Sequence, residues 1–210
     1  MENEYSFKSM DGAMRAKPND PSDESLMADF VSGSQAAFEL IFERYSSHII
    51  NFAYRFLGSR EESEDIAQEV FLRIYRAKER YDPRRPFRPW IFSIASHLIS
   101  NRRRHGKRHP EEPLEGMPQD PDGSSYGGEI EDRSLPKSEE LLEKQQLAQQ
   151  VRDALENLPE SQRQAVVLAR FEEMSYEEIS ETMKISVPAV KSLLFRARQS
   201  LKELLRIHSP

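Results

Sequence analysis

SYEEISETMKISVPAVKSLLFRARQSLKELLRI, residues 175–207, is the stretch of the chain that decides the fold. It predicts two helices, Ser175–Met183 and Val187–Ile207, joined by a connection of only Lys184, Ile185 and Ser186. Ser186 is placed to cap the second helix. A connection this short is typical of a helix-turn-helix, whose second helix enters the major groove of DNA.

The second predicted helix is amphipathic and basic. The core between the two helices is expected to consist of Ile179, Met183, Ile185, Val190 and Leu194. The outward residues are expected to be Pro188, Ala189, Lys191, Ser192, Phe195 and Arg196, followed by Arg198, Lys202 and Arg206. Arginine can read guanine bidentately and lysine can pair with phosphate, so this face favours DNA binding. The alternative is an ordinary helical hairpin with a solvated basic face.

Apolar residues at helical spacing also fill most of the remaining chain. The first half predicts helices at about Asp23–Val31, Ser34–Leu57, Ser59–Arg80 and Phe87–Arg104. The second half predicts Ser138–Leu158 and Ser161–Phe171 ahead of the pair already described. Ser161 with Gln164, and Ser175 with Glu178, have the spacing of a capping box. The fold class is therefore expected to be all-α.

The helical pattern stops in the middle of the chain. Residues 106–137 are polar and rich in proline and glycine, which is typical of a linker. We therefore expect two small helical domains, residues 22–105 and 138–207, joined by a flexible acidic linker. Residues 1–21 are expected to form a disordered leader.

Opposite charges are segregated along the chain, although the net charge is −6. The bases from Arg84 to Arg108 have no acid among them, and the acids from Glu111 to Asp132 have no base among them. DNA responds to the local field within a Debye length of about 8–10 Å, so a negative total does not exclude a nucleic-acid-binding protein.

Composition excludes several other classes of protein. Disulfides and thiolate zinc sites are ruled out because the chain has no cysteine. No run approaches the roughly 20 apolar residues of a membrane span, and the first residues lack the apolar stretch of a signal peptide, so a cytoplasmic protein without membrane insertion is expected. No cofactor is expected. A metal enzyme using His97, His105 and His109 is a weak alternative, because His105 and His109 lie in a basic, glycine-containing segment where histidine is usually solvated.

Two segments of the first half carry further signals. The predicted helix Phe87–Arg104 has a polar stripe of His97, Asn101 and Arg104, which suits nucleic acid but is also compatible with a solvated face. Trp90 of that helix lies on the apolar side, so a core role is expected for it. The segment DIAQEVFL, residues 65–72, is acidic and amphipathic and suits docking against a basic partner.

Together these segments resemble the extracytoplasmic-function (ECF, RpoE-like) group of the bacterial sigma-70 family of RNA polymerase sigma factors. Residues 65–72 resemble the region that docks on the polymerase clamp. RYDP at residues 80–83, followed by FRPWI at residues 87–91, resembles the loop and helix that engage the −10 element. VPAVKS at residues 187–192, followed by RAR at residues 196–198, resembles the −35 recognition helix.

The resemblance implies three sets of binding residues and no catalytic residue. The polymerase-binding residues are expected to be Asp65, Gln68, Glu69, Phe71 and Leu72. The residues that bind the −10 element are expected to be Tyr81, Arg84, Arg85, Arg88, His97, Asn101, Arg103 and Arg104. The residues that bind the −35 element are expected to be Ser186, Pro188, Ala189, Lys191, Ser192, Phe195, Arg196 and Arg198.

The implied partners are core RNA polymerase, through its beta and beta-prime subunits, promoter DNA, and an anti-sigma factor. The acidic linker is expected to thread the polymerase cleft. A stand-alone helix-turn-helix transcription regulator is the alternative. Such a regulator has no need of the acidic helix and the segment that resembles the −10-binding region.

Overall fold

A computed structural model describes residues 20–108 and 149–207, and within them all regular secondary structure is helical. The all-α prediction is confirmed. Nearly all of the expected leader and most of the expected linker lie outside the described residues. No helix in the described ranges is long and apolar enough to cross a membrane.

The first group of helices follows the expected bounds closely. The helices are α1 (Asp23–Val31), α2 (Gln35–Leu57), α3 (Arg60–Ala77) and α4 (Phe87–Arg108), with a 3-10 turn at Lys78–Arg80. Ser22, Ser34 and Ser59 cap the first three because each side chain accepts a backbone hydrogen bond from its helix. Gly58 lies between α2 and α3 with a φ of 71°, a conformation that glycine adopts without steric cost. Only α4 differs clearly, because it continues beyond the expected end at Arg104.

The second group begins with helical residues 149–156, followed by α6 (Glu160–Arg170), α7 (Tyr176–Met183) and α8 (Val187–Ile207). The capping box predicted for α7 is present. The one predicted at Ser161 is wrong: α6 starts one residue earlier, at Glu160, behind Pro159, and has no side-chain cap. Ser161 is therefore inside the helix, and the amide of Gln164 donates to the Ser96 hydroxyl instead, at 2.8 Å.

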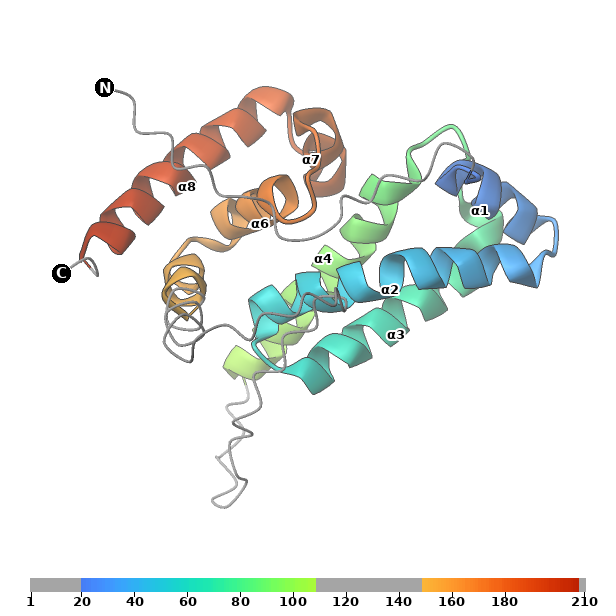
Figure 1. The fold of residues 1–210 in the computed structure, drawn as a ribbon, viewed down its shortest axis with the longest axis horizontal. Coiled ribbons are helices and arrows are strands. Elements are labelled where there is room, and N and C mark those ends of the chain that lie inside the picture. Colours follow the sequence, from blue (N-terminus) through green and yellow to red (C-terminus); the bar gives the residue numbers. More distant parts are fainter. Residues whose placement is uncertain (1–19, 109–148, 208–210) are drawn as a thin grey trace, which may run out of the picture.

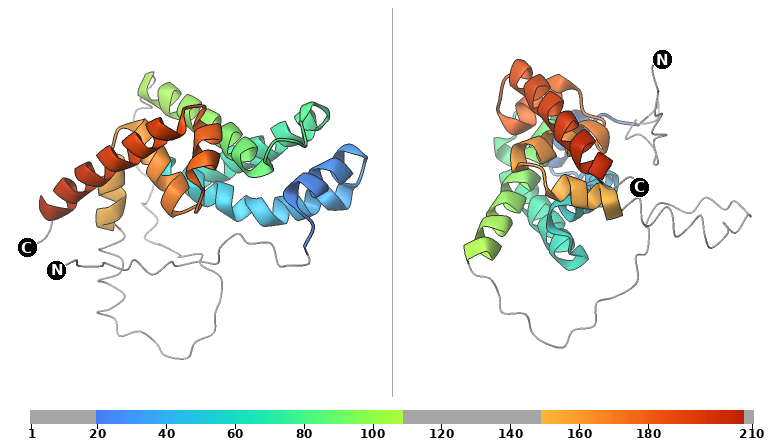
Figure 2. Two further views of the ribbon diagram at one scale, coloured as in Figure 1. Left: turned by 90° about the horizontal axis from the view of Figure 1, so that it is seen from above. Right: turned by 90° about the vertical axis from the view of Figure 1, so that its left-hand side faces the viewer.

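Helix α4 lies between α2 and α3 on one side and α6 and α7 on the other (Figure 1). Helix α8 packs on α6 and α7, away from α3 (Figure 2). One cluster of buried side chains runs through both groups, from Phe52 of α2 through Ile91 and Phe92 of α4 to Leu168 and Ile179. The two groups of helices therefore share a hydrophobic core.

Candidate nucleic-acid interface

The turn between α7 and α8 is fixed by local hydrogen bonds. Glu178 donates its backbone N–H to the Ser175 hydroxyl at 3.2 Å and accepts from the Ser175 N–H at 2.8 Å, which fixes the start of α7. Lys184 ends α7 in the left-handed conformation, with a φ of 54°. The Ser180 hydroxyl then donates to the carbonyl of Ile185 at 2.5 Å. These contacts set the angle at which α8 leaves the turn.

Helix α8 is held by its apolar face and presents its basic face to solvent. Val190 and Ala197 are fully buried, whereas Phe195 is 62% exposed. Of the residues predicted to bind the −35 element, those at 186, 188, 191, 195, 196 and 198 are exposed, and Ala189 and Ser192 are half-buried. All eight predicted residues are therefore exposed or half-buried, and their role on DNA stays a prediction.

The basic side chains of α8 are available to an anionic partner. Among the described residues, no ion pair involves Lys191, Arg196 or Arg198. Arg196 donates to the neighbouring Ser192 hydroxyl at 2.9 Å, its one hydrogen bond within the part of the chain that the structure describes. A row of cations without carboxylates beside them gives a positive local potential, which attracts the phosphates of DNA.

The polar stripe of α4 forms a short chain of hydrogen bonds. The side chains of His97 and Asn101 are 3.0 Å apart, and Arg104 donates to the Asn101 amide oxygen at 2.5 Å. His97 and Arg104 are exposed and Asn101 is half-buried. The stripe therefore offers hydrogen-bonding groups and a cation on one side of the helix.

The loop before α4 combines a buried tyrosine with exposed arginines. Tyr81 is only 8% exposed and packs against Trp90, with ring centroids 4.8 Å apart. Its hydroxyl donates to the carbonyl of Arg85 at 2.7 Å, and burial raises its pKa. Trp90 is half-buried and packs against the apolar cluster, which fits the packing role predicted for it only in part. Tyr81 thus anchors the loop from inside, whereas Arg85 is exposed.

Arg84 is highly accessible in this loop, with 90% of its side chain exposed. Its guanidinium contacts Asp82 at 3.0 Å. Hydrogen bonds from Arg84 hold the pKa of Asp82 below its usual value, although both groups lie at the surface. A contact this exposed contributes little to stability and leaves Arg84 free to exchange Asp82 for a phosphate.

Four of the five docking residues predicted on the acidic helix α3 are exposed or half-buried. Gln68 and Asp65 are exposed, Glu69 is half-buried and Leu72 is 42% exposed. Phe71 instead lies in the core, 4.7 Å from the ring of Phe42. Phe42 of α2 is itself 47% exposed beside Phe71, and the sequence analysis did not single it out.

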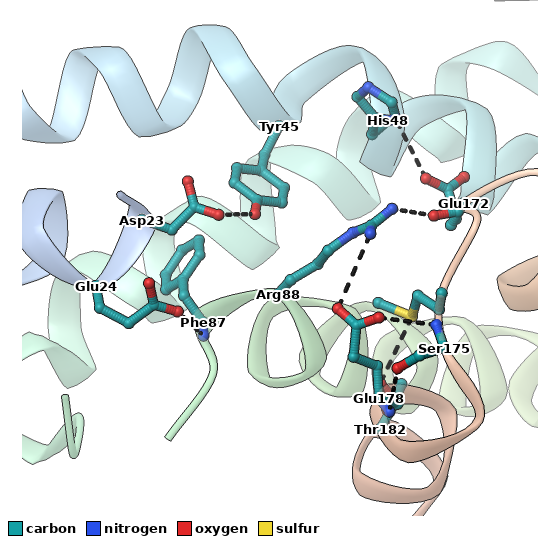
Figure 3. A network of polar contacts seen from close by, with 11 residues as sticks. Asp23, Glu24, Tyr45, His48, Phe87, Arg88, Glu172, Ser175, Glu178 and Thr182 are labelled. Atoms are coloured by element: carbon teal, nitrogen blue, oxygen red, sulfur yellow. Dashed lines mark hydrogen bonds and ion pairs between the residues drawn. The ribbon is translucent and has the colours of Figure 1, made fainter. Parts of the chain in front are cut away.

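Arg88 and Arg103, two of the residues predicted to bind the −10 element, contact the second group of helices. Arg88 donates to the backbone carbonyl of Glu172, and its guanidinium lies 3.9 Å from the Glu178 carboxylate (Figure 3). Arg103 lies 3.4 Å from the Glu160 carboxylate. No sequence pattern indicated these contacts, because each joins residues far apart in the chain.

Buried polar residues between the two groups were also missed. Arg163 is 3% exposed and donates to the carbonyl of Arg55, near the C-terminus of α2. Burial, and then the charge of Arg103, lower the pKa of Arg163. Glu172 is 2% exposed and its carboxylate lies 3.1 Å from the His48 ring. An arginine and a glutamate in amphipathic segments are expected at the surface, so burial here reflects tertiary packing.

No group of three or more histidine, aspartate or glutamate side chains within residues 20–108 and 149–207 is arranged to hold a metal ion. The weak metal alternative also invoked His109, which lies outside the described residues.

Comparison with known proteins identifies relatives of both groups of helices. Residues 41–109 match the family described as Sigma-70 region 2, and residues 148–201 match the family described as Sigma-70, region 4. The ECF RNA polymerase sigma factor SigW of Bacillus subtilis is 34% identical over 175 residues, which are 83% of this chain and 91% of SigW. The ECF RNA polymerase sigma-E factor of Escherichia coli K12 is 31% identical over 180 residues, which are 85% of this chain and 92% of that protein.

Solved structures show the same fold. CnrH, solved in complex with the cytosolic domain of CnrY, matches 90% of this chain and all of that chain with a TM-score of 0.67 and 25% identity. The sigma factor RpoE of Bartonella quintana, solved in complex with the anti-sigma factor NepR, matches 82% of this chain and 98% of that chain with a TM-score of 0.59 and 22% identity.

Proposed function

This chain belongs to the ECF group of the sigma-70 family of RNA polymerase sigma factors, and from that membership we propose that it binds core polymerase and recognises −35 and −10 promoter elements. Residues 22–105 form the domain that docks on the polymerase and engages the −10 element. Residues 138–207 form the domain that engages the −35 element, and residues 106–137 connect the two. The chain acts by positioning the polymerase and carries out no chemistry itself.

One observation supports this proposal most strongly: one chain carries two separate outward cationic surfaces and an acidic helix. The basic face of α8 suits duplex DNA in the major groove. The polar stripe of α4 and the exposed Arg84 suit a separated strand, because a positively charged groove tracks the backbone of single-stranded DNA. The stand-alone regulator is not favoured, because such a protein does not need the region 2 helices.

The contact surfaces on α3, on α4 with its preceding loop, and on α8 bind different partners during initiation. Asp65, Gln68, Glu69 and Leu72 of α3 dock on the polymerase, and Phe71 supports them from the core. Arg84, Arg85, His97, Asn101 and Arg104 hold the −10 strand. Opening this strand costs a few kcal/mol for each base taken out of the stack, which contacts to the separated strand must offset.

The proposal also includes a protein that binds this chain and inhibits it. CnrH, which resembles this chain over nearly its whole length, was solved in complex with a domain of another protein. We therefore expect an anti-sigma factor for this chain. Because it works on RNA polymerase, the chain is expected to act in the cytoplasm.

Run-off transcription tests the proposed function. The purified chain is added to core polymerase on a library of random promoter fragments, with core polymerase alone as the control. We expect transcripts from a subset of fragments that share two sequence elements. If the chain adds no transcript to those of core polymerase alone, the proposed function is wrong.

A further inference from the structure

The residues at the start of α4 are poorly suited to cap it. Helix α4 begins at Phe87, with Pro86 directly before it and Pro89 in the first turn. Proline carries no polar side-chain atom, and no acidic residue lies in this turn. The first backbone N–H groups of a helix have no partner within the helix. Those of α4 therefore need an acceptor from another part of the chain or from water.

Glu24 of α1 supplies such an acceptor. Its carboxylate accepts the backbone N–H of Phe87 at 3.0 Å, although the two residues are 63 positions apart (Figure 3). The Glu24 side chain is half-buried at this contact. A carboxylate at the N-terminus of a helix also interacts favourably with the positive end of the helix dipole. Glu24 therefore acts as a cap for α4, although it belongs to another helix.

Helix α1 holds Glu24 in place. The neighbouring Asp23 accepts hydrogen bonds from the side chains of Arg44 and Tyr45 on α2. The apolar side of α1 is buried through Leu26, Met27 and Phe30. Because α1 is already ordered by these contacts, the Glu24 carboxylate loses little further conformational freedom when it accepts the Phe87 N–H.

Phe87 also anchors the loop that precedes α4. Its side chain is fully buried, and its ring centroid lies 5.9 Å from that of Tyr81, at the other end of the loop. Burial, and then the charge of Glu24, raise the pKa of Tyr81. Glu24 therefore acts on both residues that flank the loop 82–86, on Phe87 by a hydrogen bond and on Tyr81 through its charge.

The loop between these two aromatic residues presents two arginines of the proposed −10 surface. Arg84 and Arg85 are both exposed. The backbone N–H of Arg85 donates to the carbonyl of Asp82 at 2.9 Å, and its own carbonyl accepts from the Tyr81 hydroxyl at 2.7 Å. A surface loop that is ordered in advance binds its ligand more tightly, because the cost of ordering it is not met at the moment of binding.

We propose that Glu24 is a positioning residue for the −10 element: by capping α4, it fixes the loop that presents Arg84 and Arg85 to DNA. Glu24 acts through this loop and is not required to contact DNA itself. The contacts of α8 with the −35 element do not depend on the cap. The effect on DNA rests on the proposed function, whereas the cap itself does not.

Two substitutions at position 24 separate the hydrogen bond from the rest of the side chain. Glu24→Ala removes the acceptor, whereas Glu24→Gln keeps a side-chain oxygen that can accept the Phe87 N–H. Asp29→Ala is the matched control, because it removes a carboxylate from an exposed site on the same helix.

Hydrogen exchange of the backbone amides tests the cap in the full chain without DNA. In Glu24→Ala we expect faster exchange in residues 81–90 and unchanged exchange in α8. Glu24→Gln and Asp29→Ala should exchange like the unsubstituted chain in both segments. Unchanged exchange in residues 81–90 of Glu24→Ala would overturn the cap.

DNA binding tests the positioning role. Core polymerase assembled with each variant is measured on two labelled DNAs from a promoter selected by transcription, a single strand with the −10 element and a duplex with the −35 element. We expect Glu24→Ala to bind the single strand about fivefold more weakly, the factor that corresponds to a lost cap of about 1 kcal/mol, and to bind the duplex unchanged. Glu24→Gln and Asp29→Ala should stay within about twofold of the unsubstituted chain on both DNAs.

Three results would overturn the positioning role. Equal losses on both DNAs would show that Glu24 serves only the stability of the fold. No loss on either DNA would show that the loop does not depend on Glu24. Equal losses on the single strand in Glu24→Ala and Glu24→Gln would exclude the hydrogen bond to Phe87 as the cause.

The cap and the proposed function fail in distinguishable ways. If exchange responds as expected but polymerase with the unsubstituted chain binds neither DNA, the proposed function is wrong and the cap stands. If the unsubstituted chain binds both DNAs but exchange in Glu24→Ala is unchanged, the cap is wrong and the proposed function stands.

Discussion

Arg88 and Glu172 are 84 residues apart in the chain, yet the guanidinium of Arg88 donates a hydrogen bond to the backbone carbonyl of Glu172 (Figure 3). Arg88 lies in the first turn of α4, the helix proposed to hold the −10 strand, and Glu172 lies between α6 and α7. One arginine thus joins the two groups of helices, and its use on DNA requires that they separate.

Arg196 is expected to read a base. If its guanidinium pairs with guanine in the −35 element, Arg196→Ala costs about 1–3 kcal/mol of binding and relaxes preference at one position. Competition binding with every single-base variant of a selected promoter measures this. Arg76→Ala, at an exposed site on α3, is the control for loss of an arginine. Equal weakening on all sequences would show that Arg196 contacts phosphate only.

Two phenylalanines are expected to differ sharply in their effect on stability. Phe52 is fully buried and packs against Phe92, with ring centroids 5.2 Å apart. Phe52→Ala should therefore lower the free energy of unfolding by about 3–5 kcal/mol. Phe195, which is 62% exposed, should change it by about 0.5 kcal/mol or less when replaced by alanine. Urea unfolding measures both; comparable losses would mean that α8 is not placed as described.

The two serines predicted to cap helices also give a matched pair. Ser175→Ala removes the cap of α7 and should cost about 1 kcal/mol of the free energy of unfolding. Ser161→Ala changes a residue inside α6 that makes no cap and should be close to neutral. Thermal unfolding of both variants measures the difference. A larger loss at Ser161 would mean that this serine does cap α6.

Tyr45 predicts a loss of stability at alkaline pH. Burial, and then the Asp23 carboxylate that accepts its hydroxyl hydrogen, raise the pKa of Tyr45 above the ordinary value of 10.0. The folded state then holds this proton more tightly than the unfolded state. The contribution of protonated Tyr45 to the free energy of unfolding is fully present below about pH 10 and is lost as the pH rises above that value.

Tyr45→Phe should therefore flatten the fall in unfolding free energy above about pH 10, as measured by urea unfolding across that range. Tyr54→Phe, at an exposed site on the same helix, is the control. Identical slopes for the two variants and the parent chain would exclude Tyr45 as the source of the pH dependence.

The sequence predicted helices well because local chemistry determines them. Ser22, Ser34, Ser59 and Ser175 each cap a helix within a residue of the expected start. The exception at Ser161 has a local cause, since Pro159 fixes an extended conformation ahead of α6 and the helix begins directly after it. A serine followed three residues later by glutamine or glutamate can therefore be an N-cap, or it can lie inside the first turn of a helix that begins directly after a proline.

Contacts between the two groups of helices could not be predicted in the same way. On α4, Phe92 is buried against Phe52 of the first group, whereas Ser96 and Ser100 contact Gln164 and Glu160 of the second group. The burial of Arg163 and Glu172 follows from the same packing. The spacing of apolar residues predicts one buried face of a helix. A second buried face depends on a partner helix that is distant in the chain, so this spacing does not predict it.

Helices α4 and α8 are proposed to contact different parts of one promoter while the chain is bound to core polymerase. The most direct test places a photocrosslinking amino acid at His97 of α4 or at Lys191 of α8 and maps the crosslinked bases on a promoter fragment selected by transcription. We predict crosslinks from position 191 in the upstream duplex element, and crosslinks from position 97 in the element nearer the start site. Crosslinks from both positions to the same element, or none from either in an active complex, would contradict this arrangement.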